Sequence, residues 1–296
     1  MARWDGRTRG GILGYKIFIW ILKYTNIRLA YFVLYFVALW YFITLDKKPT
    51  RFYFRKILGY SRLKTFFSIY RNYYVFGQVL IDKIAILAGF TKKFTFRFEG
   101  EEYLHQMAEE NTGGVLIGSH LGNWEIAGQL LERIDTTVHI LMFDGMQQQI
   151  KDLMNKVIDK KNIGLILIKK NDSSHLIQIA EALKRKEIIA MHGDRFLPGT
   201  KTVTTKFLGR EAELPTGPFY LASKYNVPVV YVSAMKEKTT HYHFYATKPK
   251  YFKYPANIKT REAELKAMVD DYVKKMEKMV LDYPLQWFNF YYFWKI

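Results

Sequence analysis

The sequence predicts an α/β protein with a mostly parallel central sheet flanked by helices, preceded by an N-terminal hydrophobic helical region that associates with a membrane. In residues 91–296, short apolar runs of strand length alternate with longer helical patterns. That alternation is typical of a parallel sheet with crossover helices. Residues 1–90 instead carry long, aromatic-rich apolar runs. We therefore expect membrane-anchoring or interfacial helices in 1–90 and one α/β domain in 91–296.

The best membrane candidate lies within Tyr15–Leu45. Its charge-free part, Leu29–Leu45, would form a helix about 26 Å long, slightly shorter than a hydrocarbon core. Basic residues on both sides give no clear orientation. A tilted spanning helix and a helix lying in the cytoplasmic leaflet both fit, and a buried helix of a soluble protein is the third alternative.

One or two further helices are expected between Lys56 and Phe90, contacting lipid or packed across the sheet. Phe94, Phe96 and Phe98 alternate with polar residues, which predicts a strand with one buried face. Further strands are expected at Val115–Gly118, Val138–Phe143, Leu165–Ile168, Ile188–Met191, Val227–Val232 and His241–Ala246. Helices are expected at Glu101–Glu110, Trp124–Arg133, Met146–Lys160, Ser173–Arg185, Pro215–Tyr225 and Arg261–Leu281.

The composition limits the chemistry and the partners. The 296 residues contain no cysteine, which excludes disulfides, cysteine-ligated zinc and a cysteine nucleophile and fits a protein facing the cytoplasm. The net charge of +18 favours a polyanionic partner such as an anionic membrane, an acidic carrier protein or nucleic acid. Aromatic residues make up 17%, which favours the membrane surface. We find no nucleic-acid-binding motif and expect no nucleic-acid partner.

Residues 118–125, Gly-Ser-His-Leu-Gly-Asn-Trp-Glu, follow a short apolar strand. This places His120 in the turn at the carboxyl end of that strand and Glu125 in the first turn of the next helix, with Asn123 as its cap. Ligands bind in this crevice of open α/β sheets. A histidine there can act as a general base, and a carboxylate five residues later can fix its tautomer and stabilise its cation.

The segment His-Leu-Gly-Asn-Trp-Glu resembles the HxxxxD/E motif of the glycerolipid acyltransferase superfamily. The Gly-Asn-Trp-Glu residues of this segment are most similar to those of the lipid A late acyltransferases and of the lysophospholipid and mannoside acyltransferases. The resemblance covers roughly residues 90–290. The resemblance implies an O-acyltransferase that takes its acyl chain from acyl carrier protein or coenzyme A and needs no metal and no cofactor beyond that donor. It implies that His120 and Glu125 are catalytic and that Asn123 and Trp124 contact substrate.

Residues 192–195, His-Gly-Asp-Arg, close another strand as His120 closes the first. If the two strands are neighbours, Arg195 faces the His120 crevice, where its permanent charge suits a phosphate or carboxylate. The segment resembles a superfamily block that binds the acceptor head group or stabilises the reacting carbonyl. We therefore expect Arg195 to be catalytic and Gly193 and Asp194 to bind substrate. The alternative is an Asp–Arg pair that braces a turn, with Asp194 holding Arg195.

Residues 214–218, Leu-Pro-Thr-Gly-Pro, resemble the last superfamily block, which shapes the acyl site and would place Thr216 and Gly217 there. Gly217 permits close backbone approach, and a helix start offers amide groups to an anion; a helix entry without chemistry fits equally. Asp144, at the end of another strand, is expected to touch substrate hydroxyls. The basic stretch Lys201–Gly209 forms a loop that either rims the crevice or is solvated.

Three other patterns bear on the chemistry of the chain. Ser119 is unsuited as a nucleophile because neighbours on an extended chain point to opposite faces, and Gly-x-Ser-x-Gly is absent. Histidines elsewhere show no metal-ligand spacing, so no metal site is expected. The aromatic tail Pro284–Trp294 resembles the end of lipid A acyltransferases and either packs on the sheet or dips into the interface.

We expect acyl transfer to a hydroxyl of a lipid A precursor or related glycolipid at the bacterial inner membrane, with the active site facing the cytoplasm. Other acceptors are a lysophospholipid, an aminolipid or a polyene-type metabolite. A non-catalytic membrane-surface lipid-binding protein is the alternative outside the enzymes.

Overall fold

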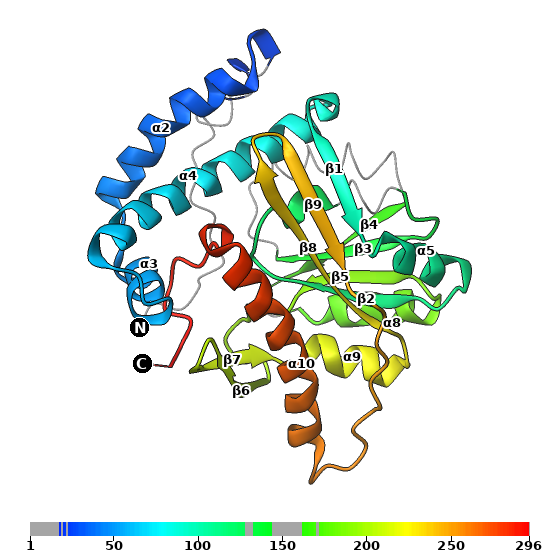
Figure 1. Ribbon diagram of the computed structural model, residues 1–296. Helices are drawn as coiled ribbons and strands as arrows, with labels where there is room; N and C mark the ends of the chain where they lie inside the picture. Colours follow the sequence, from blue (N-terminus) through cyan, green and yellow to red (C-terminus); the bar gives the residue numbers. More distant parts are fainter. Residues whose placement is uncertain are drawn as a thin grey trace.

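The computed structural model describes residues 18, 20–21, 23–127, 133–143, 162–169 and 172–295, with the side chains of Glu125 and Ala127 left out. At its centre lies a seven-stranded sheet in the order β1-β9-β8-β2-β5-β3-β4 (Figure 1). The strands are β1 Thr95–Glu99, β2 Gly114–Gly118, β3 Val138–Phe143, β4 Ile163–Ile168, β5 Ile188–His192, β8 Val229–Lys238 and β9 His241–Ala246.

The sheet is mostly parallel, as the sequence predicts. Strands β8, β2, β5, β3 and β4 run in one direction. Strand β9 is antiparallel to β8, and β1 pairs in parallel with β9. The carboxyl ends of β2, β5 and β8 therefore lie at one edge of the sheet, where parallel folds gather their functional groups.

Helices cover both faces of this sheet. The α-helices of the described residues are α2 Ile27–Thr44, α3 Lys48–Phe52, α4 Arg62–Leu87, α5 Glu101–Glu109, α8 Ser174–Lys184, α9 Gly217–Tyr225 and α10 Arg261–Asp282. The same residues also form a π-helix, η1 Tyr53–Ile57, and the 3-10 helices η2 Thr91–Lys93, η3 Trp124–Ala127 and η4 Pro284–Gln286.

Strand β2 explains why two layers of helices are needed. All five of its residues are buried, and successive side chains point to opposite faces. Val115 and Ile117 join one core with residues of α8, α9 and α10. Leu116 joins a second core with residues of α2, α4 and α5. A strand that is apolar on both faces is typical of a sheet buried between helices.

Most predicted elements are confirmed to within a few residues, and one prediction is wrong. The basic stretch Lys201–Gly209 is not a loop: it forms most of a hairpin of β6 Thr202–Phe207 and β7 Arg210–Pro215. Val203, Thr205 and Phe207 alternate as buried residues of β6, and β6 packs on α10. The helix predicted for Trp124–Arg133 is described only as the short η3. The helix predicted at Met146–Lys160 lies outside the described residues.

The N-terminal region contributes to the cores and also exposes apolar surface. Helices α2 and α4 lie side by side (Figure 1), and the Tyr35 and Tyr74 rings stack with centroids 4.3 Å apart. Helix α2 is long and apolar enough to span a membrane, and 28% of it is buried. Tyr53 and Phe54 of η1 belong to the same core as the C-terminal tryptophans. The boundary expected between residues 90 and 91 stays a prediction.

The aromatic tail packs inside the protein. Trp287 is 2% exposed and Trp294 is 4% exposed. The Trp294 indole Nε1 donates to the Phe207 carbonyl at 2.8 Å. Of the two placements expected for the tail, the structure has the first, in which it packs on the body of the domain.

Candidate active site

The site lies where β2 and β5 end together. In their parallel pairing Gly118 is opposite His192, and the Gly193 N–H donates to the Gly118 carbonyl at 3.0 Å. The condition set for Arg195, that these two strand ends are neighbours, is thus met. The turn after β2 and the turn after β5 leave the same edge of the sheet side by side.

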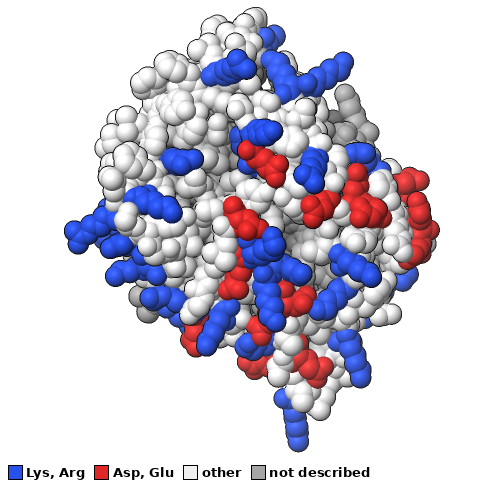
Figure 2. All heavy atoms as spheres, viewed as in Figure 1, with Lys and Arg blue, Asp and Glu red and all other residues white. Residues whose placement is uncertain are grey.

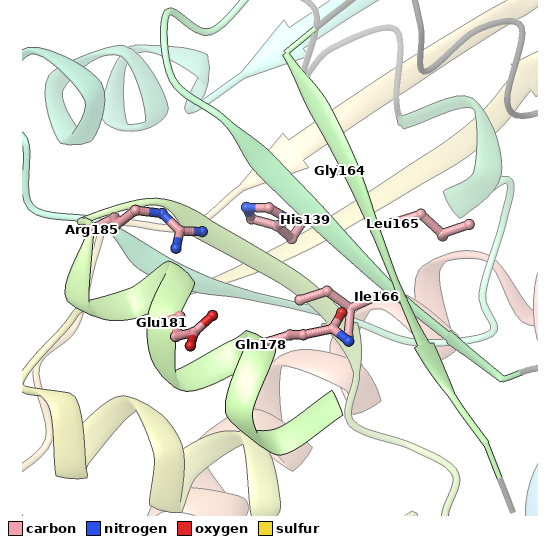
Figure 3. A pocket seen from close by; sticks show the side chains of 7 residues that line it. All are labelled: His139, Gly164, Leu165, Ile166, Gln178, Glu181 and Arg185. Atoms are coloured by element: carbon pink, nitrogen blue, oxygen red, sulfur yellow. The ribbon is translucent and has the colours of Figure 1, made fainter. Parts of the chain in front are cut away.

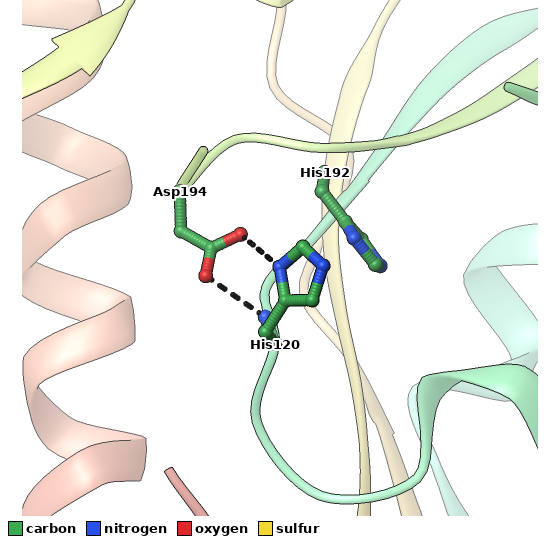
Figure 4. A group of neighbouring side chains, drawn as sticks. All are labelled: His120, His192 and Asp194. Carbon is green, nitrogen blue, oxygen red and sulfur yellow. Dashed lines mark hydrogen bonds and ion pairs between the residues drawn. The ribbon is translucent and has the colours of Figure 1, made fainter. Parts of the chain in front are cut away.

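Asp194 holds His120 by two hydrogen bonds. The His120 backbone N–H donates to Asp194 Oδ2 at 3.0 Å, and the ring Nδ1 lies 2.9 Å from Asp194 Oδ1 (Figure 4). Asp194 is 2% exposed. Because a carboxylate accepts hydrogen bonds, the proton of a neutral His120 is placed on Nδ1, and Nε2 lies on the far side of the ring from Asp194.

The electrostatics keep Asp194 ionised. Burial by itself raises the pKa of this carboxyl. The charge and hydrogen bond of His120, followed by the charge of Arg195, outweigh burial and hold the pKa well below its usual range. Asp194 is therefore an anion that can orient the imidazole and stabilise its cation, as the carboxylate does in catalytic triads.

Two further rings close around His120. The His192 ring centroid lies 4.2 Å from that of His120, and the Trp124 ring lies 4.4 Å from His192 at 88°. Burial lowers the pKa of His192 well below its ordinary value, and the nearby positive charges of His120 and Arg195 add to this. His192 is thus a neutral neighbour. The substrate contact predicted for Trp124 stays a prediction, and its ring lies beside the catalytic candidate.

Within the described residues, His120, His192 and Asp194 form one group whose potential ligand atoms all lie within 4.8 Å of one another. Here Asp194 Oδ1 and His120 Nδ1 are 2.9 Å apart and face each other as hydrogen-bond partners. We interpret the cluster as a hydrogen-bonded His–Asp pair with a second histidine beside it.

The turn that carries His120 depends on one glycine. Gly122 has φ +66°, and a Cβ there would lie 2.1 Å from the Ala234 carbonyl oxygen, so a side chain would both strain the backbone and collide with β8. The Gly122 N–H donates to the Gln286 carbonyl at 2.9 Å, and the His120 carbonyl accepts from the Phe288 N–H at 3.1 Å. The C-terminal segment thus holds the turn in place.

Asn123 supports this turn from the interior. Its side chain is 1% exposed and donates to the Val79 carbonyl at 3.2 Å and to the Tyr242 hydroxyl at 3.3 Å. Its backbone N–H donates to the Ala234 carbonyl at 2.7 Å. A substrate contact, as predicted from the motif, would require this packing to open. The substrate contact of Asn123 stays a prediction, and these hydrogen bonds hold the turn that carries His120.

Arg195 is held by the C-terminal segment. Its Nη2 donates to the Phe288 carbonyl at 2.8 Å, and its guanidinium lies 5.6 Å from the centre of the Tyr291 ring. Asp194, which we expected to bind substrate or to hold Arg195, has both oxygens on His120. Gly193 packs closely: a Cβ there would lie 2.7 Å from Ile117 Cγ2. The substrate roles of Gly193 and Arg195 stay predictions.

The remaining candidates are Thr216 and Gly217, at the start of α9, and Glu125 and Asp144. Thr216 is buried, and its N–H and hydroxyl donate to the Lys201 carbonyl at 3.1 and 3.2 Å. Gly217 begins α9, and a role in the acyl site stays a prediction for both residues. The side chain of Glu125 and the whole of Asp144 lie outside the described residues.

Sequence reasoning did not single out Tyr272 or the backbone of the C-terminal tail as parts of the site. The Tyr272 hydroxyl donates to the Gly118 carbonyl at 2.9 Å and is buried. It comes from the middle of α10, where its apolar neighbours give no sign of a role at the sheet edge. The aromatic tail was visible as a motif, but its hydrogen bonds to the His120 turn depend on the folded chain.

A separate cavity lies away from these residues. It has a volume of about 250 Å³ and is formed between β3, β4 and α8, with His139, Gly164, Glu181 and Arg185 among its lining residues (Figure 3). His139 is level with Ile189 in the sheet, near the amino end of β5 and not at the carboxyl end where His120 sits. The cavity is therefore distinct from the His120 site.

Fold and site together define an α/β enzyme with a histidine–carboxylate pair at the carboxyl edge of a parallel sheet, suited to base-assisted group transfer. The chain belongs to the bacterial lipid A biosynthesis acyltransferase family, whose model matches residues 69–296. It is therefore an acyltransferase, from a family that is typically membrane-associated.

Among solved structures, the 1-acyl-sn-glycerophosphate acyltransferase PlsC from Thermotoga maritima is similar at 17% identity and a TM-score of 0.37. The match covers 83% of this chain and 98% of that one. No curated protein matches the sequence.

Proposed function

We propose that this acyltransferase moves a fatty acyl chain from a thioester of acyl carrier protein or coenzyme A to a hydroxyl group of a lipid A precursor or related glycolipid. The observation that carries the proposal is the His120–Asp194 pair, whose Nδ1–Oδ1 distance is 2.9 Å, at the carboxyl edge of the sheet. Family membership supports the reaction type.

In the proposed mechanism His120 Nε2 takes the proton of the acceptor hydroxyl as its oxygen attacks the thioester carbonyl carbon. The tetrahedral intermediate then collapses, the carbon–sulfur bond breaks, and the imidazolium returns its proton to the departing thiolate. Asp194 keeps the proton on Nδ1 throughout and stabilises the imidazolium. A general base of this kind contributes about 10²–10⁴-fold.

Asp194 takes the orienting role that the sequence motif suggested for Glu125. The contact of Asp194 with Nδ1 supports this assignment, because the single Nδ1–H donates to one carboxylate oxygen at a time. Glu125, whose side chain lies outside the described residues, stays a predicted catalytic residue. Arg195 is proposed to stabilise the oxyanion or bind an acceptor phosphate, since a guanidinium suits both. Its positive charge lowers the pKa of both Asp194 and His192.

Helix α2 is proposed to bind the cytoplasmic leaflet of the bacterial inner membrane, so that the lipid acceptor reaches the site from the bilayer. Large apolar side chains on α2 are exposed to solvent: Leu29, Phe32, Tyr35, Phe36, Leu39, Trp40, Tyr41 and Ile43. Figure 2 shows uncharged surface with scattered Lys and Arg over α2 and α4. Aromatic residues beside cations suit an anionic lipid interface.

A mass-spectrometric assay tests the proposal. Purified protein in detergent would receive acyl carrier protein or coenzyme A thioesters together with lipids from membranes that lack this enzyme. A glycolipid that gains one acyl mass with the unmutated protein, and not with His120→Ala, is the expected result. A product on a lysophospholipid, aminolipid or polyene-type acceptor would redirect the acceptor assignment, and transfer by His120→Ala at the unmutated rate would overturn the mechanism.

The donor carrier is tested by ionic strength. With an acidic carrier protein as donor, the +18 chain should lose activity steeply between low and physiological salt, because screening shortens to about 8 Å at 0.15 M. A flat salt profile with coenzyme A thioesters active would favour coenzyme A. Binding of lipid without any acyl transfer, equally by both proteins, would favour a non-catalytic lipid-binding role.

A further inference from the structure

A buried polar network lies between α2, α4 and the sheet, and its centre is Asp82 of α4, which is 0% exposed. The Asp82 carboxylate accepts hydrogen bonds from the hydroxyls of Tyr31 on α2 and Tyr242 on β9. It also forms an ion pair with Lys236 Nζ of β8 at 2.5 Å. Lys236 Nζ donates in addition to the Tyr31 hydroxyl at 3.1 Å. One carboxylate therefore joins four elements.

Stability alone explains this network poorly. Burial raises the pKa of Asp82 and lowers the pKa of Lys236, although each partner opposes the shift of the other. Buried ion pairs are often replaceable by well-packed apolar residues without loss of stability, whereas they can fix one specific geometry. The network is therefore better explained by the geometry that it fixes than by the stability that it adds.

The network reaches the turn that carries His120. The Asn123 side chain donates to the Tyr242 hydroxyl at 3.3 Å, and Tyr242 donates onward to Asp82. The backbone of Lys236 makes a second link. Its N–H donates to the Gln286 side chain at 2.9 Å and its carbonyl accepts from that side chain at 2.8 Å, while the Gln286 carbonyl accepts from the Gly122 N–H at 2.9 Å.

We propose that Asp82 is a positioning residue that sets the catalytic turn, residues 119–123, and ties its geometry to the seating of α2 on the domain. The tie runs from Tyr31 through Asp82 and Tyr242 to Asn123. Loss of the Tyr31 end and loss of the Tyr242 end therefore loosen the same turn. The inference rests on the proposed acyl transfer for its kinetic readout, whereas its structural readout does not need that reaction.

The structural readout is hydrogen exchange in peptides that cover residues 119–127. Tyr31→Phe and Tyr242→Phe each remove one hydroxyl and keep the ring, so the variants are expected to fold. Tyr231→Phe is the matched control, because its buried hydroxyl also donates to a carboxylate, Asp271, at 3.0 Å. We expect about 3- to 10-fold faster exchange in both network variants and no change in the control. Exchange that is unchanged in both network variants, or equally fast in the control, overturns the inference.

The kinetic readout separates positioning from folding. Both network variants should lower kcat about 3- to 10-fold with little change in KM, since a misplaced base affects the chemical step. The double variant Tyr31→Phe/Tyr242→Phe should lose much less than the product of the single losses, because both act through Asp82. Multiplicative losses would overturn the shared path. If the unmutated protein transfers no acyl group, the proposed function fails while the exchange result still decides this inference.

Discussion

Of the histidine–carboxylate pairs that the described residues form on the sheet, His120–Asp194 and His139–Glu187 are the shortest, and only the first has the setting of a catalytic base. The His120 Nδ1–Asp194 distance is 2.9 Å, and the His139 Nε2–Glu187 distance is 2.7 Å. The side chain of Asp194 is 2% exposed and serves His120 through both oxygens. The Glu187 side chain is 20% exposed and also accepts from Arg185 at 3.0 and 2.8 Å.

The two carboxylates differ in their hydrogen-bond partners. Arg185 is the main cause of the lowered pKa of Glu187, ahead of His139. For Asp194, His120 is the main group that opposes burial. The His139 ring also lies against β4, since a Cβ on Gly164 would be 2.2 Å from its Nδ1. A short His–carboxylate distance therefore does not identify a general base; its place at the carboxyl edge and its partners do.

The largest expected effect is that of His120→Ala, which breaks the first pair. Acyl transfer should fall by about 10²–10⁴-fold because the general base is lost. Single-turnover rates of acyl transfer would measure the loss, with circular dichroism to show that the fold is retained. A loss below about tenfold would mean that His120 is not the base.

Asp194→Asn should have the next largest effect, since it keeps the shape and removes the charge that supports the imidazolium. A hydrogen bond to a charged group contributes about 1.5–3 kcal/mol, which corresponds to roughly 10- to 100-fold in rate. The rate loss should lie in kcat. Equal activity in Asp194→Asn and the unmutated protein would transfer the orienting role back to Glu125, whose variant Glu125→Gln is the comparison.

A smaller effect is expected on stability in acid. The folded state lowers the pKa of His192, so the unfolded chain binds more protons and stability falls as pH drops below about 6.5. This loss has a slope of up to about 1.4 kcal/mol per pH unit for one proton. Asp194, whose pKa is also lowered, adds a second loss only below about pH 4.

Denaturant unfolding at pH 7.5, 6 and 5 would measure the first of these losses. His192→Gln should flatten the decline between pH 6.5 and 5, because glutamine does not titrate. If the free energy of unfolding of His192→Gln declined with the same slope as that of the unmutated protein, the decline would belong to other titrating groups. His120→Gln is the comparison, since it removes the neighbouring histidine.

The smallest effect is expected for His139→Gln, which breaks the second pair. The rate of acyl transfer should stay within about twofold of that of the unmutated protein. The free energy of unfolding should change by no more than about 1 kcal/mol, as for a partly exposed pair. The measurement is the same assay beside a thermal melt. An activity loss comparable to that of Asp194→Asn would mean that both pairs belong to one functional unit.

Local pattern predicted much of the fold. The six-residue apolar run of Val138–Phe143 has the bounds predicted from it, because apolar, β-favouring runs of that length have few alternatives. The hairpin at Thr202–Pro215 was missed because its strands are rich in Thr, Lys and Glu, which resemble a solvated loop. Its buried face becomes visible only where α10 packs on it.

The site was predicted in part. His120 follows from a motif in eight consecutive residues, and Arg195 from a second strand end. Asn123 was expected at the substrate, whereas its side chain is buried between Val79 and Tyr242. Tyr272 carried no signal, since a tyrosine on an amphipathic helix is most often a core residue.

The sequence by itself determined where strands end and which histidine follows a strand end, because both depend on neighbours along the chain. Only the tertiary structure brings Asp194 to that histidine. Asp194 lies 74 residues from His120, and the two meet because β2 and β5 pair in parallel with Gly118 opposite His192. Strand pairing is a choice among many segments of similar apolar character, and packing on both faces of the sheet makes that choice.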